Sequence, residues 1–168
     1  VRVEHDEPCA LVLEGVPERG EVLLVVVLVL LGRTLRAAPI DVVVAGDGDF
    51  LSIGMEHIAP QASRNLNIAA VIMDNAVYGL TKGQASPTSQ PGHVTSSTPF
   101  GNPVEGLNAL RLYLTLGISF VASGLSSKVK DLSRMISAAM DYPGFAVVHV
   151  QSPCTTYHDT YERLKGSV

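Results

Sequence analysis

Two apolar runs, each ending in a polar turn, constrain the fold of this chain more than any other feature. The first, residues 42–45 (VVVA), has no polar face and breaks into Gly46-Asp47-Gly48-Asp49. The second, residues 68–73, ends in Asp74-Asn75. Uninterrupted apolar runs of this length predict strands of a parallel sheet that is covered on both faces. The two polar turns would then lie at the carboxyl edge of that sheet, where ligands bind in such folds.

Segments with helical spacing separate the predicted strands. Residues 50–64 form the first, and Pro60 should kink or shorten it. A second helix should begin at Asn102, which suits the N-cap and is followed by Pro103 and Glu105, and it should end at Gly117. The third should be capped by Ser126-Ser127. The predicted buried stripes are Leu51, Met55, Ile58 and Ala62; Val104, Leu107, Leu110 and Leu114; and Val129, Leu132, Met135, Ile136, Ala139 and Met140.

Further strands are expected at residues 119–122 and 145–150. Strands that alternate with helices predict an α/β fold, a parallel sheet with helices on both faces. Residues 74–101 show neither pattern and are rich in Gly, Pro, Ser and Thr. A loop of this length inside a compact domain is usually functional or disordered.

The length of 168 residues predicts a single domain, residues 1–168. We divide it into an irregular or incomplete part (1–40), a regular core (41–158) and a tail (159–168). Residues 22–31 predict a buried strand, and they are about half as long as a membrane span. With no recognisable signal peptide, we expect a cytoplasmic protein without a membrane partner.

Charge and cysteine content narrow the classes of function. A net charge of -4 with 12 Lys plus Arg argues against nucleic-acid binding. Two cysteines, Cys9 and Cys154, do not make a disulfide framework. By default each would be a structural thiol, and His149 would be a satisfied, half-buried histidine of a strand.

The two polar turns offer oxygen ligands for a hard cation. The Asp47 carboxylate, the Asn75 side-chain oxygen and the Val77 carbonyl would suit Mg²⁺, which also takes oxygens from substrate phosphates. Gly46 and Gly48 permit backbone conformations closed to other residues and close approach of a ligand. Amides that open the following helix could donate to a phosphate. Acidic glycine turns are common, so a turn without a ligand remains the alternative at this point.

Longer motifs point to a family. Gly-Asp-Gly followed by Asn75 resembles the thiamine-diphosphate-binding motif. Residues 46–54 (GDGDFLSIG) and 75–89 (NAVYGLTKGQASPTS) resemble the β subunit of 2-oxoacid:ferredoxin oxidoreductases, and residues 151–154 (QSPC) resemble the region of that family's last cluster cysteine. The resemblance covers roughly residues 41–158 and implies a thiamine-diphosphate-binding fold.

The resemblance assigns roles to individual residues. It implies a metal site at Asp47, Asn75 and the Val77 carbonyl, with Lys82 beside the 2-oxoacid and Cys154 as one ligand of a [4Fe-4S] cluster. The residues that it implies for contact with the cofactor are Gly46, Gly48, Asp49, Gly79 and Leu80.

The activity implied is oxidative decarboxylation of a 2-oxoacid, either 2-oxoglutarate or pyruvate, to acyl-CoA and CO₂ with reduction of ferredoxin. Thiamine diphosphate, Mg²⁺ and the cluster would be the cofactors. The implied partners are an α subunit, ferredoxin, the 2-oxoacid and coenzyme A. The family's cofactor is activated by a glutamate of the α subunit, so no acid or base is expected in this chain.

The departures from the family lie on the N-terminal side. Leu31 stands where the family has a histidine, and Cys9 is the only cysteine before residue 41, so the four thiolates of a [4Fe-4S] cluster are not present. We therefore expect an N-terminally incomplete or diverged member. Two other hypotheses stay open: a non-oxidative thiamine-dependent decarboxylase or synthase, and a catalytically dead subunit that packs against a partner.

Overall fold

The computed structural model describes residues 40–165. The predictions for the strand at 22–31, for Cys9 and for Leu31 lie outside these residues.

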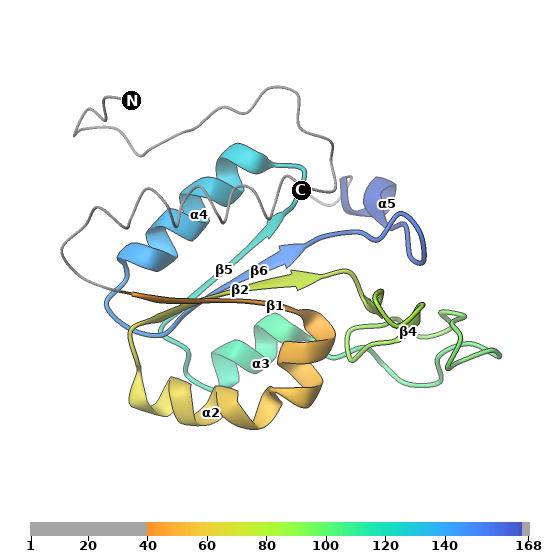
Figure 1. Cartoon of the computed structure of the whole chain (residues 1–168), viewed down its shortest axis with the longest axis horizontal. Helices are drawn as coiled ribbons and strands as arrows, with labels where there is room; N and C mark the ends of the chain where they lie inside the picture. The colour runs from red at the N-terminus through yellow and green to blue at the C-terminus, as the bar shows by residue number, and fades with distance from the viewer. Residues whose placement is uncertain (1–39, 166–168) are drawn as a thin grey trace.

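Four parallel strands form the sheet, as predicted (Figure 1). In spatial order they are β1 (Asp41–Gly46), β2 (Ile68–Asp74), β6 (Ala146–Gln151) and β5 (Phe120–Leu125). Two short strands, β3 (Val77–Tyr78) and β4 (Gln84–Ala85), pair antiparallel outside this sheet. The helical segments are η1 (Asp49–Ile53), α2 (Met55–Arg64), α3 (Ala109–Thr115), α4 (Val129–Asp141) and α5 (Tyr161–Lys165).

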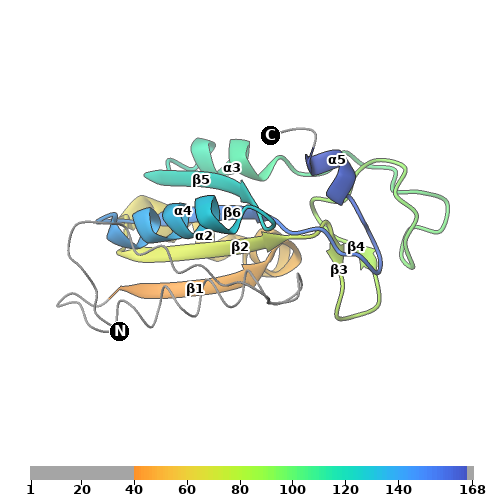
Figure 2. The ribbon, with the colours of Figure 1, turned by 90° about the horizontal axis from the view of Figure 1, so that it is seen from above.

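Helices cover both faces of the sheet, which confirms the predicted fold class. In Figures 1 and 2, α4 lies on one face, and α2 and α3 lie on the other. The α4 stripe has the predicted spacing and packs against side chains of β2 and β6. On the opposite face, side chains of η1, α2 and α3 pack against β2 and β6. The buried residues of α4 are Leu132, Ile136, Ala139 and Met140.

The position of β1 differs from the prediction of a strand covered on both sides. Within residues 40–165, β1 has β2 as its single strand neighbour and forms one edge of the sheet. Val43 and Val44 are 42% and 38% exposed. A valine run shows that a segment is extended and apolar, but its periodicity does not distinguish an edge strand from a central one.

The predicted helix at 50–64 is divided at Gly54. A five-residue π-helical turn, η1, precedes it, and the Gly54 amide donates to the Asp49 carbonyl at 2.6 Å. The α2 helix then runs through Pro60 without ending there, so the prediction that Pro60 shortens the helix is wrong. Because the helical phase changes at Gly54, Met55 is turned outward while Ile58 and Ala62 are buried.

The helix predicted from Asn102 begins six residues later. The N-cap of α3 is Asn108, whose side chain accepts from the Arg111 amide at 3.0 Å. Asn102 is instead buried in the preceding loop, where its amide donates to the carbonyl of Ser89. The shift also corrects the buried stripe: Val104 and Leu114 are exposed, while Ala109 and Tyr113 are buried. Gly117 follows the helix with φ +72°, as its end requires.

The start of α4 also differs in detail. Its N-cap is Lys128 rather than Ser126 or Ser127, and no side chain caps it. None of the helices within residues 40–165 combines the length and the apolar character that a membrane crossing needs.

Candidate functional site

The two polar turns lie side by side at the carboxyl edge of the sheet. The register of β1 and β2 places Gly46 opposite Met73, so both strands end at the same level. The backbone amide of Asn75 donates to Asp47 Oδ1 at 3.4 Å. Asp47 is 1% exposed. The structure thus brings the Asp47 side chain against the backbone of Asn75, so the two residues that the sequence nominates as metal ligands are neighbours.

The chain turns sharply after β2. Ala76 has φ +58°, and its amide donates to Asp74 Oδ1 at 2.9 Å. The Val77 amide then donates to Asn75 Oδ1 at 3.1 Å. These two bonds fix Asn75 and the backbone of Val77 next to Asp47.

A hydroxyl from the long loop joins the site. The Thr88 hydroxyl lies 2.8 Å from Asp47 Oδ2 and 2.8 Å from Asp74 Oδ1. The loop is held there by Ser89, which is fully buried and donates to the Ala76 carbonyl at 2.6 Å. The Ser86-Pro87-Thr88-Ser89 segment is therefore part of the site through Thr88.

Asp74 is the second buried carboxylate of the site, and it is bound from the next strand. His149 of β6 is 1% exposed, and its Nε2 lies 3.0 Å from Asp74 Oδ2. Its Nδ1 lies 3.2 Å from the hydroxyl of Tyr113 in α3. His149 is thus satisfied on both ring nitrogens, as expected, but it is more deeply buried than a half-buried residue.

Burial affects the two carboxylates differently. Burial raises the pKa of Asp47, and the neighbouring charge of Asp74 raises it further, against smaller opposing hydrogen bonds. Burial also acts to raise the pKa of Asp74, but the hydrogen bond and charge of His149, with hydrogen bonds from Thr88 and the Ala76 amide, hold it below its usual range. Asp47 is therefore the carboxylate whose negative charge is less compensated.

The distribution of hydrogen-bond donors between Asp74 and Asp47 favours a cation beside Asp47. Asp74 accepts from His149 and the Ala76 amide and shares the Thr88 hydroxyl with Asp47. Asp47 has in addition one long contact to an amide and a side-chain hydrogen bond from Ser86. Within residues 40–165, no group of three His, Cys, Asp or Glu side chains is arranged to hold a metal ion. A set of one carboxylate, one amide oxygen and one carbonyl, completed by phosphate oxygens, suits Mg²⁺.

A glycine is needed at position 48 because a larger side chain would overlap a neighbouring ring, and not because of the backbone dihedral angles. Its φ and ψ are −63° and −42°, which any residue adopts, so the predicted conformational reason is wrong. A Cβ at Gly48 would lie 2.7 Å from Cδ1 of Tyr78, whose hydroxyl contacts the Gly48 carbonyl at 3.3 Å. At Gly46, a Cβ would meet nothing closer than 4.0 Å.

The contrast between these two glycines can be tested. Gly48→Ala should lower the free energy of unfolding by about 1–3 kcal/mol, because the added methyl group overlaps the Tyr78 ring. Gly46→Ala, the matched control, should change it by about 0.5 kcal/mol or less. Urea unfolding of both variants measures the difference, and equal losses would show that the Tyr78 contact is not the cause.

The other predicted cofactor residues lie on the exposed side of the site. Asp49 opens η1 and is exposed, and Leu80 is fully exposed in the turn between β3 and β4. Gly79 lies beside the Asn75 side chain. Lys82 is exposed and has φ +77°, a left-handed conformation that is uncommon for a residue other than glycine. The structure places Gly79 next to the Asn75 side chain, whereas Leu80 and Lys82 are exposed.

Cys154 lies on a segment that returns to the end of β2. The Ser152 amide donates to the Asp74 carbonyl at 2.7 Å, and the His158 amide donates to the Cys154 carbonyl at 2.9 Å. The His158 ring stacks on His93 with 3.9 Å between centroids. Cys154 is half-buried and not in a disulfide. It is the only cysteine in residues 40–165, so the described part of the chain does not hold the four thiolates of a cluster.

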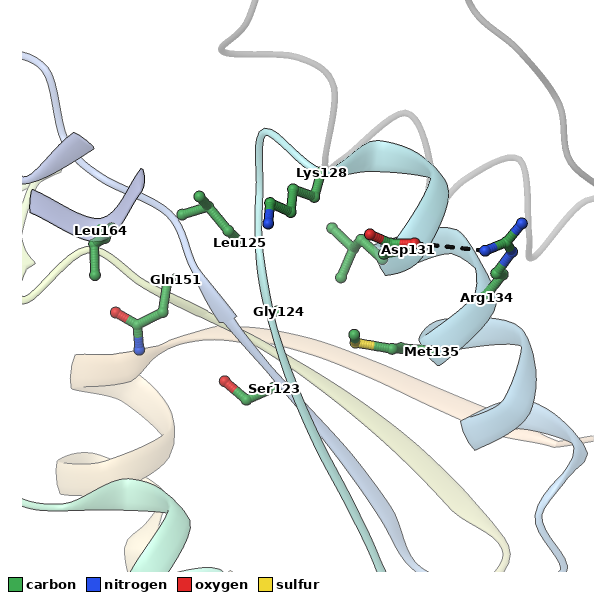
Figure 3. A pocket seen from close by; sticks show the side chains of 10 residues that line it. Ser123, Gly124, Leu125, Lys128, Asp131, Arg134, Met135, Gln151 and Leu164 are labelled. Carbon is green, nitrogen blue, oxygen red and sulfur yellow. Dashed lines mark ion pairs between the residues drawn. The ribbon is translucent and has the colours of Figure 1, made fainter. Parts of the chain in front are cut away.

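A separate hollow of about 460 Å³ lies on the α4 face of the sheet (Figure 3). Its walls come from the end of β5, the first half of α4, Gln151 and Leu164. Asp131 and Arg134 form an ion pair at its rim, 3.5 Å apart. None of the residues nominated as ligands lines it.

Sequence reasoning missed four members of the site: Thr88, Asp74, His149 and Tyr113 as a connected group. Asp74 adjoins Asn75, so its place at a strand end is the one signal that could have indicated it. The others come from a loop, a strand and a helix that meet only in the folded chain.

Comparison with known proteins decides the family. The family model described as thiamine pyrophosphate enzyme, C-terminal TPP binding domain, matches residues 30–150, more than half of the chain. The chain belongs to this family. A solved structure, 2-oxoglutarate:ferredoxin oxidoreductase from Magnetococcus marinus with 2-oxoglutarate, coenzyme A and succinyl-CoA bound, shares the fold with a TM-score of 0.71 and 39% identity. That similarity covers 84% of this chain and 47% of the other.

Relatives in the family confirm the more specific resemblance. The β subunit of 2-oxoacid:ferredoxin oxidoreductase 1 from Aeropyrum pernix is 42% identical over 71% of this chain and 38% of its own length. The 2-oxoglutarate oxidoreductase subunit KorB of Mycobacterium tuberculosis is 41% identical over 70% of this chain and 31% of its own. The matched part thus spans less than half of these relatives.

Proposed function

We propose that this chain is the thiamine-diphosphate-binding part of a 2-oxoacid:ferredoxin oxidoreductase. The supporting observation is the juxtaposition of the buried Asp47 carboxylate with Asn75 at the ends of two adjacent parallel strands. Together with an α subunit, it would convert a 2-oxoacid and coenzyme A to acyl-CoA and CO₂ and reduce ferredoxin.

Each predicted ligand has a place in this proposal. Asp47, Asn75 and the Val77 carbonyl would hold Mg²⁺ against the diphosphate, and Gly79 would lie beside the cofactor. Thiamine diphosphate, when bound, supplies the electron sink for decarboxylation. The residues of this chain would bind and orient it, with the buried Asp47 carboxylate on the side of the metal. The remaining cofactor contacts proposed are Gly46, Gly48, Asp49 and Leu80.

Lys82 is proposed on the substrate side. Its exposed ammonium, held by a left-handed backbone next to the β3–β4 turn, is free to approach the carboxylate of a 2-oxoacid. The names of the relatives from M. tuberculosis and M. marinus support 2-oxoglutarate as the first substrate to assay, with pyruvate as the second. Cys154 would give one thiolate to a [4Fe-4S] cluster, but the two cysteines of this chain cannot complete one. A cytoplasmic location stays a prediction.

Ligand-induced stabilisation tests the proposal directly. Mg²⁺ and thiamine diphosphate added together should raise the thermal midpoint of the chain, while either alone should have a smaller effect, because the metal bridges protein and diphosphate. Thiamine without phosphates is the matched control and should give no shift. Absence of any shift with both ligands would favour the hypothesis of a dead subunit.

A further inference from the structure

A series of buried and half-buried hydrogen bonds leads from the proposed metal ligand across the sheet to α3. It runs from Asp47 through the Thr88 hydroxyl to Asp74, then through the His149 ring to the Tyr113 hydroxyl. Its contacts measure 2.8, 2.8, 3.0 and 3.2 Å in that order. Three of its five residues, Asp47, Tyr113 and His149, are 1% exposed or less. The proposed function uses only the Asp47 end of this series of hydrogen bonds.

Thr88 has a single hydroxyl hydrogen and lies between two carboxylates. A hydroxyl carries one hydrogen, so Thr88 can donate to Asp47 or to Asp74 but not to both. Asp74 accepts in addition from His149 and from the Ala76 amide, at 3.0 and 2.9 Å. Asp74 thus has two donors besides Thr88, whereas Asp47 has a side-chain hydrogen bond from Ser86 and an amide 3.4 Å away. The Thr88 hydroxyl, 2.8 Å from each carboxylate, links the two.

At the far end of these hydrogen bonds, Tyr113 fixes the orientation of the His149 ring. An ionised carboxylate only accepts, so the His149 nitrogen facing Asp74 carries a hydrogen, and in the neutral ring the other nitrogen accepts from Tyr113. The Tyr113 ring is fully buried, with its centroid 5.8 Å from that of His149. The orientation of His149 is therefore set by a side chain of α3 on the other layer of the fold.

We propose that Thr88, assisted by His149 and Tyr113, is a positioning residue for Asp47 and so determines the affinity of the site for Mg²⁺. The inference rests on the proposed function, since it concerns the metal of that same site. Thr88 holds the ligand carboxylate in one orientation, as outer groups do in metal sites generally. His149 and Tyr113 act through Asp74, and their effect on the metal is indirect.

Titration calorimetry with Mg²⁺ at saturating thiamine diphosphate tests this. Thr88→Val keeps the shape and removes the hydroxyl, and it should weaken Mg²⁺ binding by about tenfold or more. Thr88→Ser, the matched control, keeps the hydroxyl and should bind Mg²⁺ with the affinity of the unchanged chain. Tyr113→Phe, which removes one oxygen at the far end, should weaken binding by about twofold to threefold. It also keeps the test decisive if Thr88→Val does not fold.

The outcomes separate the two proposals. No binding of Mg²⁺ and thiamine diphosphate by the unchanged chain would overturn the proposed function and this inference with it. Binding by the unchanged chain, with equal affinity in Thr88→Val or Tyr113→Phe, would overturn the inference alone. A loss in Thr88→Ser as large as in Thr88→Val would also overturn it, because the hydroxyl would then not be the cause.

Discussion

Replacing Asp47 by alanine is expected to abolish the stabilisation that Mg²⁺ and thiamine diphosphate together give to the chain. At about 100 times the dissociation constant, the ligands should add about 2.7 kcal/mol to the unfolding free energy of the unchanged protein. For a chain of this size that is a rise in midpoint of about 5–10 °C. Asp47→Ala removes the carboxylate proposed as the metal ligand, so the midpoint should not move. Differential scanning calorimetry with and without the ligands measures both.

The control for this variant is another acidic residue far from the site. Asp131→Ala removes an exposed carboxylate on α4 and should keep the full ligand-induced shift. The midpoint of Asp47→Ala without ligands has to be measured separately, because removing one of two neighbouring carboxylates also relieves repulsion in the free protein. An undiminished ligand-induced shift in Asp47→Ala would show that Asp47 is not a ligand.

Leu132→Ala should cost about 2–5 kcal/mol of unfolding free energy, the second large effect that the structure predicts. Leu132 is 1% exposed and lies between α4 and the sheet, where truncation leaves a cavity. Leu114→Ala is the matched control on α3, since Leu114 is 67% exposed and should lose about 0.5 kcal/mol or less. Urea denaturation gives both values.

This pair of variants also tests the corrected boundary of α3. The local sequence pattern predicts both leucines to be buried, whereas the structure buries only Leu132. A loss at Leu114 as large as that at Leu132 would support the helix that the sequence predicts from Asn102, and it would contradict the observed α3.

The strands were predictable because each is a short apolar run bounded by turn residues. Their order was not, because the register of β6 between β2 and β5 depends on packing between segments distant in sequence. The start of α3 was missed for a different reason. Asn102 has the side chain of an N-cap, but its amide donates to the carbonyls of Ser89, Gln90 and Val104 in the loop. A local capping signal cannot reveal that competition.

Some residues of the candidate site could likewise be predicted from the sequence, and others could not. Asp47 and Asn75 follow directly from two strand ends, and this was enough to nominate both. Thr88 and His149 could not be nominated, because their partners Asp47 and Asp74 are 41 and 75 residues away in the chain. A threonine in a loop and a histidine in a strand have no pattern of their own. Only the fold shows that they belong to the same buried chain of hydrogen bonds.

The order of the strands has a consequence for how the chain is made. Among the four strands of the described sheet, β6 is the last to leave the ribosome, yet it lies between β2 and β5. Until residues 146–151 emerge, β5 has no neighbour within the described sheet, and the carboxylate of Asp74 lacks its histidine. The described sheet and the site are therefore completed together, late in synthesis. A nascent chain that stops before β6 leaves β5 unpaired and one edge of β2 exposed.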